Sequence, residues 1–235
     1  MSSIMVTRVK AIEILQQYIG QNLGIYADQF WIQRFVNWKQ NKWWKWLVLE
    51  RLIWLSNNCS RAPNGLGFEL KSVSFTDKNG VLIPKETMAI TMINPNELLY
   101  ESFYESHCWN KLKQLVFCAV EWTWHNQEDA ILQWVTSFDF QSDLDLVNNI
   151  EMDYNLIQQK LITFGWLWLT GSDGIWMQAR TKWAGHGSTS RAFYARKNLV
   201  TKIFEWNEIS WSWRRFATLG DVSKRPLIAH QIVTI

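Results

Sequence analysis

The first part of the chain places apolar and polar residues with the period of an amphipathic helix. Apolar side chains recur every three or four positions from Ile12 to Leu49. A repeat of this length puts them on one face of a helix. The run SNNCSRAPNG at 56–65 then collects the Asn, Ser, Pro and Gly residues that end helices. We therefore predict a helical N-terminal lobe over residues 1–57.

The remainder of the chain changes to the shorter period that is typical of strands. In LGFELKSVSF at 66–75 apolar and polar residues alternate, and DKNG at 77–80 follows as a turn signal. Strand-like and helix-like stretches then alternate, which predicts a mixed α/β protein. We treat residues 1–235 as one domain, with a sheet-bearing lobe over 58–235. The expected strands are 66–75, 86–93, 115–122, 130–138 and 175–180; helices are expected over about 140–163 and from 197 onward, with a turn at 171–174.

Composition excludes a disordered chain, and the distribution of charge is more informative than its sum. Hydrophobic residues make up 48% of the chain and charged residues 19%, with a net charge of +3. The segment 121–159 has eight acidic residues and no basic one, whereas 174–204 has six basic residues and no acidic one. A polyanion would be attracted to the basic segment and repelled from the acidic one. The alternative is that both segments are ordinary solvated faces.

Several other classes of site find no support in the sequence. Cys59, Cys108 and Cys118 are too few and too widely spaced for a zinc site or a disulfide framework, so reduced thiols are expected. The four histidines show no metal-ligand spacing, and a GxSxG motif is absent. Neither a signal-peptide pattern nor an apolar run of transmembrane length occurs, so we expect no membrane association and a cytoplasmic location. The 17 tryptophans are expected to be core or interface anchors, with stacking on unpaired bases as the alternative.

The strongest local signal for chemistry is Glu69-Leu70-Lys71 in the first predicted strand. Side chains two positions apart in a strand project from the same face, so Glu69 and Lys71 point together. A carboxylate can hold Mg²⁺, and a neighbouring ammonium group can position water or stabilise charge on a phosphate. The pair therefore suits metal-dependent phosphodiester hydrolysis. Taken alone, such a pair is more often an ordinary surface ion pair.

Five blocks of sequence follow one another as GLGFELKSVSF, KNGVLIPKETMAITMINP, WNKLKQLVFCAVEW, IWMQARTKWAG and RAFYARKN. In order and spacing they resemble the MutH family, and the resemblance extends over about residues 44–205. That family contains the mismatch-repair nickase MutH and related type II restriction endonucleases that cut at GATC. The resemblance implies the PD-(D/E)xK nuclease fold, a mixed sheet flanked by helices, and Mg²⁺ as the cofactor.

The resemblance also implies roles for individual residues. Glu69 would be a metal ligand together with the backbone carbonyl of Leu70, and Lys71 would be the catalytic lysine. Glu50 matches a glutamate near the active site, and Lys111 matches a lysine near the scissile phosphate. Arg180 and Lys182 fall in the block that reads DNA in this family, and Arg196 and Lys197 match a basic pair near the DNA. Apart from the resemblance, the position of His186 between Lys182 and Arg191 suits contact with a base or a phosphate. The expected DNA-binding residues are Arg180, Thr181, Lys182, His186, Arg191, Arg196 and Lys197.

One position departs from the family pattern. The family's first metal-binding aspartate lies seven residues before the glutamate, where this chain has Ala62. An alanine side chain has no oxygen with which to hold a metal. Three explanations stay open: an alanine put in place of a native aspartate so that DNA is bound but not cut, a natural protein that is inactive or uses another acid such as Glu50, or a loop aligned out of register. We favour the first, because the other residues of the site are retained.

These observations together predict a Mg²⁺-dependent endonuclease that cuts double-stranded DNA at a short specific site, as a type II restriction enzyme does. Base edges would be read in the major groove by residues around 178–190. Cutting both strands requires two active sites, so a homodimer on DNA or two binding events are expected. The alternatives are a mismatch-repair nickase, which needs an activating partner, and a catalytically dead protein that binds a specific DNA sequence.

Overall fold

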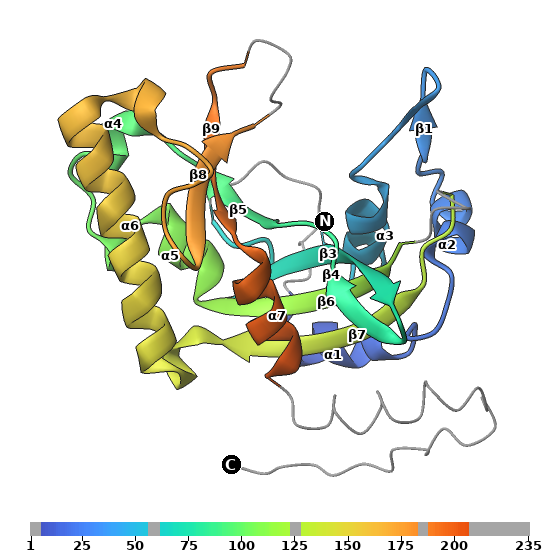
Figure 1. Cartoon of the computed structure of the whole chain (residues 1–235). Helices are drawn as coiled ribbons and strands as arrows, with labels where there is room; N and C mark the ends of the chain where they lie inside the picture. Colours follow the sequence, from blue (N-terminus) through green and yellow to red (C-terminus); the bar gives the residue numbers. More distant parts are fainter. Residues whose placement is uncertain (1–5, 56–61, 123–127, 183–187, 207–235) are drawn as a thin grey trace, which may run out of the picture.

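A four-stranded mixed sheet forms the centre of the computed structural model, which describes residues 6–55, 62–122, 128–182 and 188–206. Its strand order is β4-β3-β6-β7, with β3 parallel to β6 and the other neighbours antiparallel. A second, antiparallel sheet has the order β5-β9-β8. Helices flank the sheets (Figure 1), which confirms the predicted fold class. The strands are β3 (Glu69–Lys78), β4 (Val81–Pro84), β5 (Met88–Met92), β6 (Gln114–Glu121), β7 (Leu132–Asp139), β8 (Met177–Thr181) and β9 (Arg191–Ala195).

The central strand β6 separates two hydrophobic cores. Every residue from Leu115 to Val120 is buried, as expected for a strand that is covered on both faces. Its odd-numbered residues join a core shared with α6 (Leu144–Phe164) and α7 (Lys197–Glu205). Its even-numbered residues join a second core, which is shared with the N-terminal helices. The start of β3, where Glu69 lies, is therefore held between two packed layers.

The N-terminal lobe contains helices and one short hairpin. The prediction of helix throughout 1–57 is wrong at this hairpin, in which β1 (Phe35–Val36) pairs with β2 (Lys39–Gln40). Asn37 and Trp38, between the two strands, have φ values of 48° and 64°. Positive φ at both central residues closes a two-residue turn and cannot continue a right-handed helix. The helices of the lobe are α1 (Arg8–Gln16), α2 (Leu23–Gln29) and α3 (Trp44–Leu52).

The strand predictions hold for β3, β5, β6, β7 and β8, and α6 and α7 confirm the two expected helices with shifted ends. Besides β1 and β2, two further strands, β4 and β9, are absent from the prediction. β4 follows the tight turn at Asn79 and Gly80, which have φ values of 58° and 80°. β9 is a short apolar run that directly precedes α7, and only its pairing with both β5 and β8 makes it a strand. The remaining short elements are α4 (Pro95–Leu98), α5 (His107–Leu112) and the 3₁₀ turns η1 (Phe103–Glu105), η2 (Phe140–Ser142) and η3 (Trp166–Trp168).

Asp153 in α6 fixes the entry into β8. Its carboxylate accepts hydrogen bonds from the backbone N–H groups of Ile175, Trp176 and Met177 at 2.8, 2.6 and 2.8 Å. The residue is only 5% exposed. Gly174 precedes these donors with a φ of 75°, and a Cβ at this position would collide with the backbone carbonyl of Met177. The predicted turn at GSDG thus delivers three donors to one buried acid.

We expect Asp153→Asn to lower the free energy of unfolding by about 3 kcal/mol, because an amide cannot accept from all three N–H groups and leaves buried donors unpaired. Urea denaturation measures this change. Asp145→Asn is the matched control, since Asp145 is exposed on the same helix; it should cost less than about 1 kcal/mol. Equal losses in the two variants would contradict the role of Asp153.

None of the helices in the described part of the chain combines the length and the apolar character needed to cross a bilayer. Cys108 and Cys118 are buried free thiols, as predicted, and burial raises the pKa of both above its usual value. Cys59 lies outside the described residues. Among the described tryptophans, three are buried, namely Trp44, Trp109 and Trp122, and four are half-buried, namely Trp46, Trp134, Trp166 and Trp176. The others are exposed: Trp31, Trp38, Trp43, Trp54, Trp168 and Trp206.

Candidate active site

Glu69 lies at the first position of β3 and collects two lysines. The glutamate side chain is only 4% exposed. Its Oε1 accepts hydrogen bonds from Lys71 Nζ at 3.0 Å and from Lys111 Nζ at 3.3 Å. Lys71 projects from the same strand, and Lys111 comes from the last turn of α5. Three residues that the sequence places in the site are therefore in direct contact.

Asn64 connects this cluster to Glu50 of α3. Its side-chain amide donates to Glu50 Oε1 at 3.1 Å, and its backbone N–H donates to Glu69 Oε2 at 3.1 Å. The Asn64 Oδ1 accepts the backbone N–H of Leu70 at 2.8 Å. One residue of the loop before β3 thus binds both carboxylates and fixes its own position on the strand.

Burial shapes the electrostatics of the cluster. The pKa of Glu50 is raised to about 7, chiefly because burial disfavours the carboxylate; the hydrogen bond from Asn64 opposes the shift, and the charge of Glu69 adds to it. Burial also lowers the pKa of Lys71, which the charge of Glu69 partly offsets. The Lys71 ammonium group donates in addition to the backbone carbonyl of Ile90 at 3.1 Å. These groups are shielded from bulk water. The electrostatic interactions between them are therefore stronger than they would be in water.

The donor set fits a hard divalent cation, although the described residues contain no group of three or more His, Cys, Asp and Glu side chains. Glu50 and Glu69 supply two carboxylates joined through Asn64. Glu50 Oε2 is buried and has no hydrogen-bond partner among the described residues, which is costly for a carboxylate oxygen. A cation that prefers oxygen ligands would satisfy this atom.

Two further predicted positions lie beside the cluster. Leu70 directs its side chain into the second core, and its backbone N–H is bound by Asn64. Ala62 is exposed in the bend that leads to β3. It adds no oxygen to the site, so the acidic ligands available among these residues are Glu50 and Glu69.

The two predicted reading residues at the end of β8 have different neighbours: Arg180 lies against β9 and the start of β5, and Lys182 reaches the N-terminal lobe. Arg180 is exposed, lies over the ring of Tyr194 at 5.0 Å from its centroid, and donates to Thr87 Oγ1 at 3.3 Å. Lys182 follows the strand, and its ammonium group is 5.4 Å from the ring centroid of Trp43, just before α3. The pKa of Lys182 is lowered by burial and by the charge of Lys71. Lys182 is therefore close enough to Lys71 for the two charges to interact.

The other predicted DNA contacts separate into different environments. Arg191 is only 6% exposed, and its guanidinium donates to Thr181 Oγ1 and to the carbonyl of Leu167 at 3.3 and 3.0 Å. The Arg191 side chain therefore holds Thr181 and the segment around Leu167 together, and its contact with DNA stays a prediction. Thr181 serves as its acceptor. His186 lies outside the described residues.

Arg180 also lines an open pocket of about 560 Å³ together with Arg196 and Lys197. Arg196 donates to the carbonyls of Gly171 and Asp173 at 2.8 and 3.0 Å. Three cations and no acidic residue are present among the described residues that line this pocket. Such a surface attracts an anion. Its remaining lining residues are Thr87, Ile175, Gln178 and Asn198.

Comparison with known families assigns the central part of the chain. Residues 56–143 match the family model of the DNA mismatch repair enzyme MutH. This segment belongs to the MutH family. It includes Glu69, Lys71 and Lys111, and it indicates an endonuclease or nickase that acts on DNA. The mixed α/β fold is accordingly a MutH-like nuclease fold. No curated protein matches the chain. Glu50 and the basic residues of β8, β9 and α7 lie outside the MutH match.

Asn64 lies in the MutH segment and contacts both acids, but the sequence analysis does not predict it as a site residue. Its contacts depend on the path of the loop before β3, which periodicity does not predict. The available signal is its place in Pro63-Asn64-Gly65, a turn composition five residues before Glu69. An Asn in such a turn tends to bind nearby backbone groups, as it does here with Leu70.

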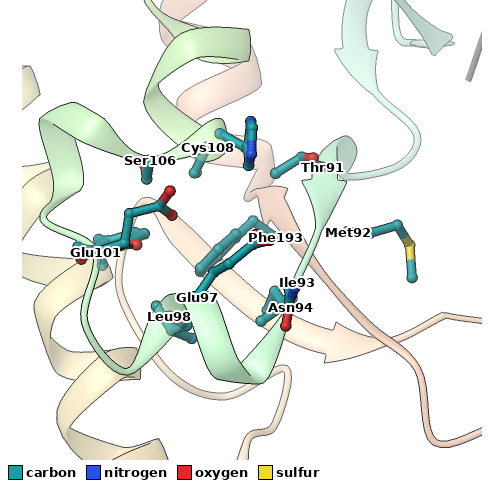
Figure 2. A pocket seen from close by; sticks show the side chains of 12 residues that line it. Thr91, Met92, Ile93, Asn94, Glu97, Leu98, Glu101, Ser106, Cys108 and Phe193 are labelled. Atoms are coloured by element: carbon teal, nitrogen blue, oxygen red, sulfur yellow. Dashed lines mark hydrogen bonds between the residues drawn. The ribbon is translucent and has the colours of Figure 1, made fainter. Parts of the chain in front are cut away.

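A second cavity in the MutH segment is too small for a substrate. Figure 2 shows its lining, which is contributed mainly by β5, α4 and α5 and includes Glu97, Glu101 and Cys108. Its volume of about 20 Å³ is enough for about one water molecule. This cavity is therefore a small packing space and not a binding site for DNA.

Proposed function

We propose that the chain is a Mg²⁺-dependent endonuclease that cuts double-stranded DNA at a short specific sequence, in the manner of a type II restriction enzyme. The observation that carries the proposal is the contact of Lys71 and Lys111 with one oxygen of Glu69, within 3.3 Å, inside the segment that belongs to the MutH family. Two ammonium groups beside a buried carboxylate are suited to charge stabilisation at a phosphate.

In this proposal each residue of the cluster has one task. Glu69 and Glu50 hold the ion, with the backbone carbonyl of Leu70 as a further oxygen ligand. Bound Mg²⁺ supplies charge stabilisation and lowers the pKa of a bound water. Lys71 uses two of its three N–H groups on Glu69 and on a backbone carbonyl, which leaves one to orient the attacking water. Lys111 binds a non-bridging oxygen of the scissile phosphate.

Ala62 decides whether this form is active. We propose that it stands where the active enzyme has a metal-binding aspartate. The support is that Glu69, Lys71 and Lys111 are in contact although this one ligand is missing. The resulting protein would bind DNA and cut it very slowly.

DNA would enter from the side on which Lys182 approaches Lys71. Arg180 and Lys182 would read base edges, because arginine and lysine can pair with guanine O6 and N7 in the major groove. Arg196 and Lys197 would hold phosphates, which fix the register of the protein on the duplex. GATC or a relative of it is the proposed site, and a homodimer on DNA or two binding events would cut both strands.

We expect Lys197→Ala to weaken binding to a duplex and to reduce the slope of log K against log salt concentration by about 1, because one phosphate contact is lost. Fluorescence anisotropy at several salt concentrations measures both quantities. Lys10→Ala is the control, since Lys10 is exposed on α1 and paired with Glu13. The same slope in parent and Lys197→Ala protein would contradict the phosphate contact.

A comparison of Ca²⁺ with Mg²⁺ tests the function itself. The parent chain is expected to bind duplex DNA in Ca²⁺ and to cut plasmid DNA poorly in Mg²⁺. Ala62 also favours a second candidate, a protein that binds a specific sequence and never cuts. Tight binding without cleavage, even after Ala62→Asp, would establish this second function. Absence of binding to any duplex would contradict both.

A further inference from the structure

The β1–β2 hairpin carries a tryptophan that contributes nothing visible to folding. Trp38 is 99% exposed at the tip of the hairpin. It also has a φ of 64°, in the left-handed region that is unfavourable for a bulky side chain and natural for glycine. A tryptophan with an unfavourable backbone conformation that buries no apolar surface does not stabilise the fold. Such a residue points to a role in binding another molecule.

The base of the hairpin is held firmly. Asn41 donates its backbone N–H to the carbonyl of Arg34 at 2.8 Å and its side-chain amide to the carbonyl of Gln33 at 2.9 Å. Its Oδ1 accepts the backbone N–H of Trp43 at 3.1 Å. The tip is therefore presented from an anchored base that continues directly into α3, the helix of Glu50.

The charge of the surrounding segment favours a polyanion. Between Asp28 and Glu50 the chain has four basic residues and no acidic one. Arg34 is neutralised by Asp28 at 2.8 Å. Lys39, the first residue of β2, and Lys42, which follows this strand, are exposed. An exposed aromatic ring flanked by ammonium groups is the combination with which proteins stack on bases and bind the backbone beside them.

The β1–β2 hairpin also lies on the same side of the molecule as the proposed DNA-reading residues at the end of β8. Trp43, at its base, contacts Lys182 beyond the end of β8, with 5.4 Å between ammonium group and ring centroid. In Figure 1 the hairpin projects beyond α3 on the same side as the end of β8 and the adjoining start of β9. DNA that lies against Glu69 and Lys182 therefore meets this hairpin at its flank.

We propose that the β1–β2 hairpin is a second DNA-binding element, in which Trp38 stacks on a base of the bound duplex while Lys39 and Lys42 bind the phosphates beside it. The inference rests on the proposed function and extends it to a part of the chain outside the MutH match. When an apolar side chain inserts between two base pairs, it partly unstacks them and bends the duplex.

Trp38→Gly tests the proposal without damaging the fold, because glycine adopts the observed φ readily. The probe is a 24-base-pair duplex with a central GATC and 2-aminopurine at adenine positions, in Ca²⁺. We expect about 10-fold weaker binding by anisotropy, loss of the 2-aminopurine fluorescence increase that the parent protein causes, and an unchanged melting temperature. Trp38→Phe should retain most of the affinity. Tyr100→Ala is the control, since Tyr100 is 88% exposed just after α4, and in Figure 1 α4 and the β1–β2 hairpin lie on opposite sides of the molecule.

Each other outcome overturns a specific statement. Equal affinity and equal 2-aminopurine response in parent and Trp38→Gly protein would remove the hairpin from the DNA interface and leave the proposed function intact; the tip would then serve a protein partner. A lower melting temperature in Trp38→Gly would show a structural role instead. If the parent binds no duplex at all, the proposed function fails and this inference fails with it.

Discussion

Ala62→Asp is expected to raise Mg²⁺-dependent cleavage of duplex DNA by about 1,000-fold, which corresponds to the several kcal/mol that a correctly held metal ion contributes to phosphoryl chemistry. The added carboxylate would join Glu50 and Glu69, whose side chains are already linked through Asn64. The assay follows conversion of supercoiled plasmid to nicked and linear forms, with and without Mg²⁺, and sequencing of the ends identifies the site.

Ala62→Asn is the matched control, because it adds a side chain of the same size without the charge. It should recover only a small part of the activity. The substrate set must include methylated and unmethylated DNA, since the methylation requirement of the site is part of the test. An Ala62→Asp protein that binds these substrates and cuts none of them would contradict the proposed role of position 62.

Glu69→Gln in the Ala62→Asp background is expected to reduce cleavage by about 10,000-fold, because the ion loses its ligand and both lysines lose their shared partner. Duplex binding in Ca²⁺-free buffer should persist, since a negative charge next to the phosphate has been removed. Gel assays and anisotropy separate the two effects.

Glu13→Gln serves as the control for this loss. Glu13 is also paired with a lysine, Lys10, at 3.1 Å, and the pair is exposed on α1. This variant should cut at the rate of the Ala62→Asp protein. Undiminished cleavage in the Glu69→Gln protein would exclude Glu69 from the chemistry.

The sequence predicts the part of the site that follows from strand geometry. The two-residue period of a strand suffices to place Glu69 beside Lys71. Glu50 and Lys111 come from different elements, so only the resemblance to the MutH family indicates that they belong with Glu69. Asn64 acts through a loop whose path is set by the packed structure. For this reason only the three-dimensional structure identifies Asn64 as the residue that links Glu50 and Glu69.

Errors in the prediction have local physical causes. Apolar residues around the β1–β2 hairpin fit a helical repeat, but positive φ at Asn37 and Trp38 turns the chain back on itself. The DNA-binding role of Arg191 stays a prediction, but the sequence does not show that two of its guanidinium nitrogens donate to Thr181 and to a backbone carbonyl. Charge in the sequence does not show which cations the fold has already paired. β9 becomes a strand only because β5 and β8 pair with both its edges.

A crystal structure of the chain as it stands, bound to duplex DNA in Ca²⁺, tests the central claim most directly. We expect a Ca²⁺ ion about 2.3–2.6 Å from a Glu69 oxygen and from a phosphate oxygen, with Lys71 and Lys111 beside the same phosphate. A duplex bound on another face of the protein, with no phosphate near Glu69, would contradict it.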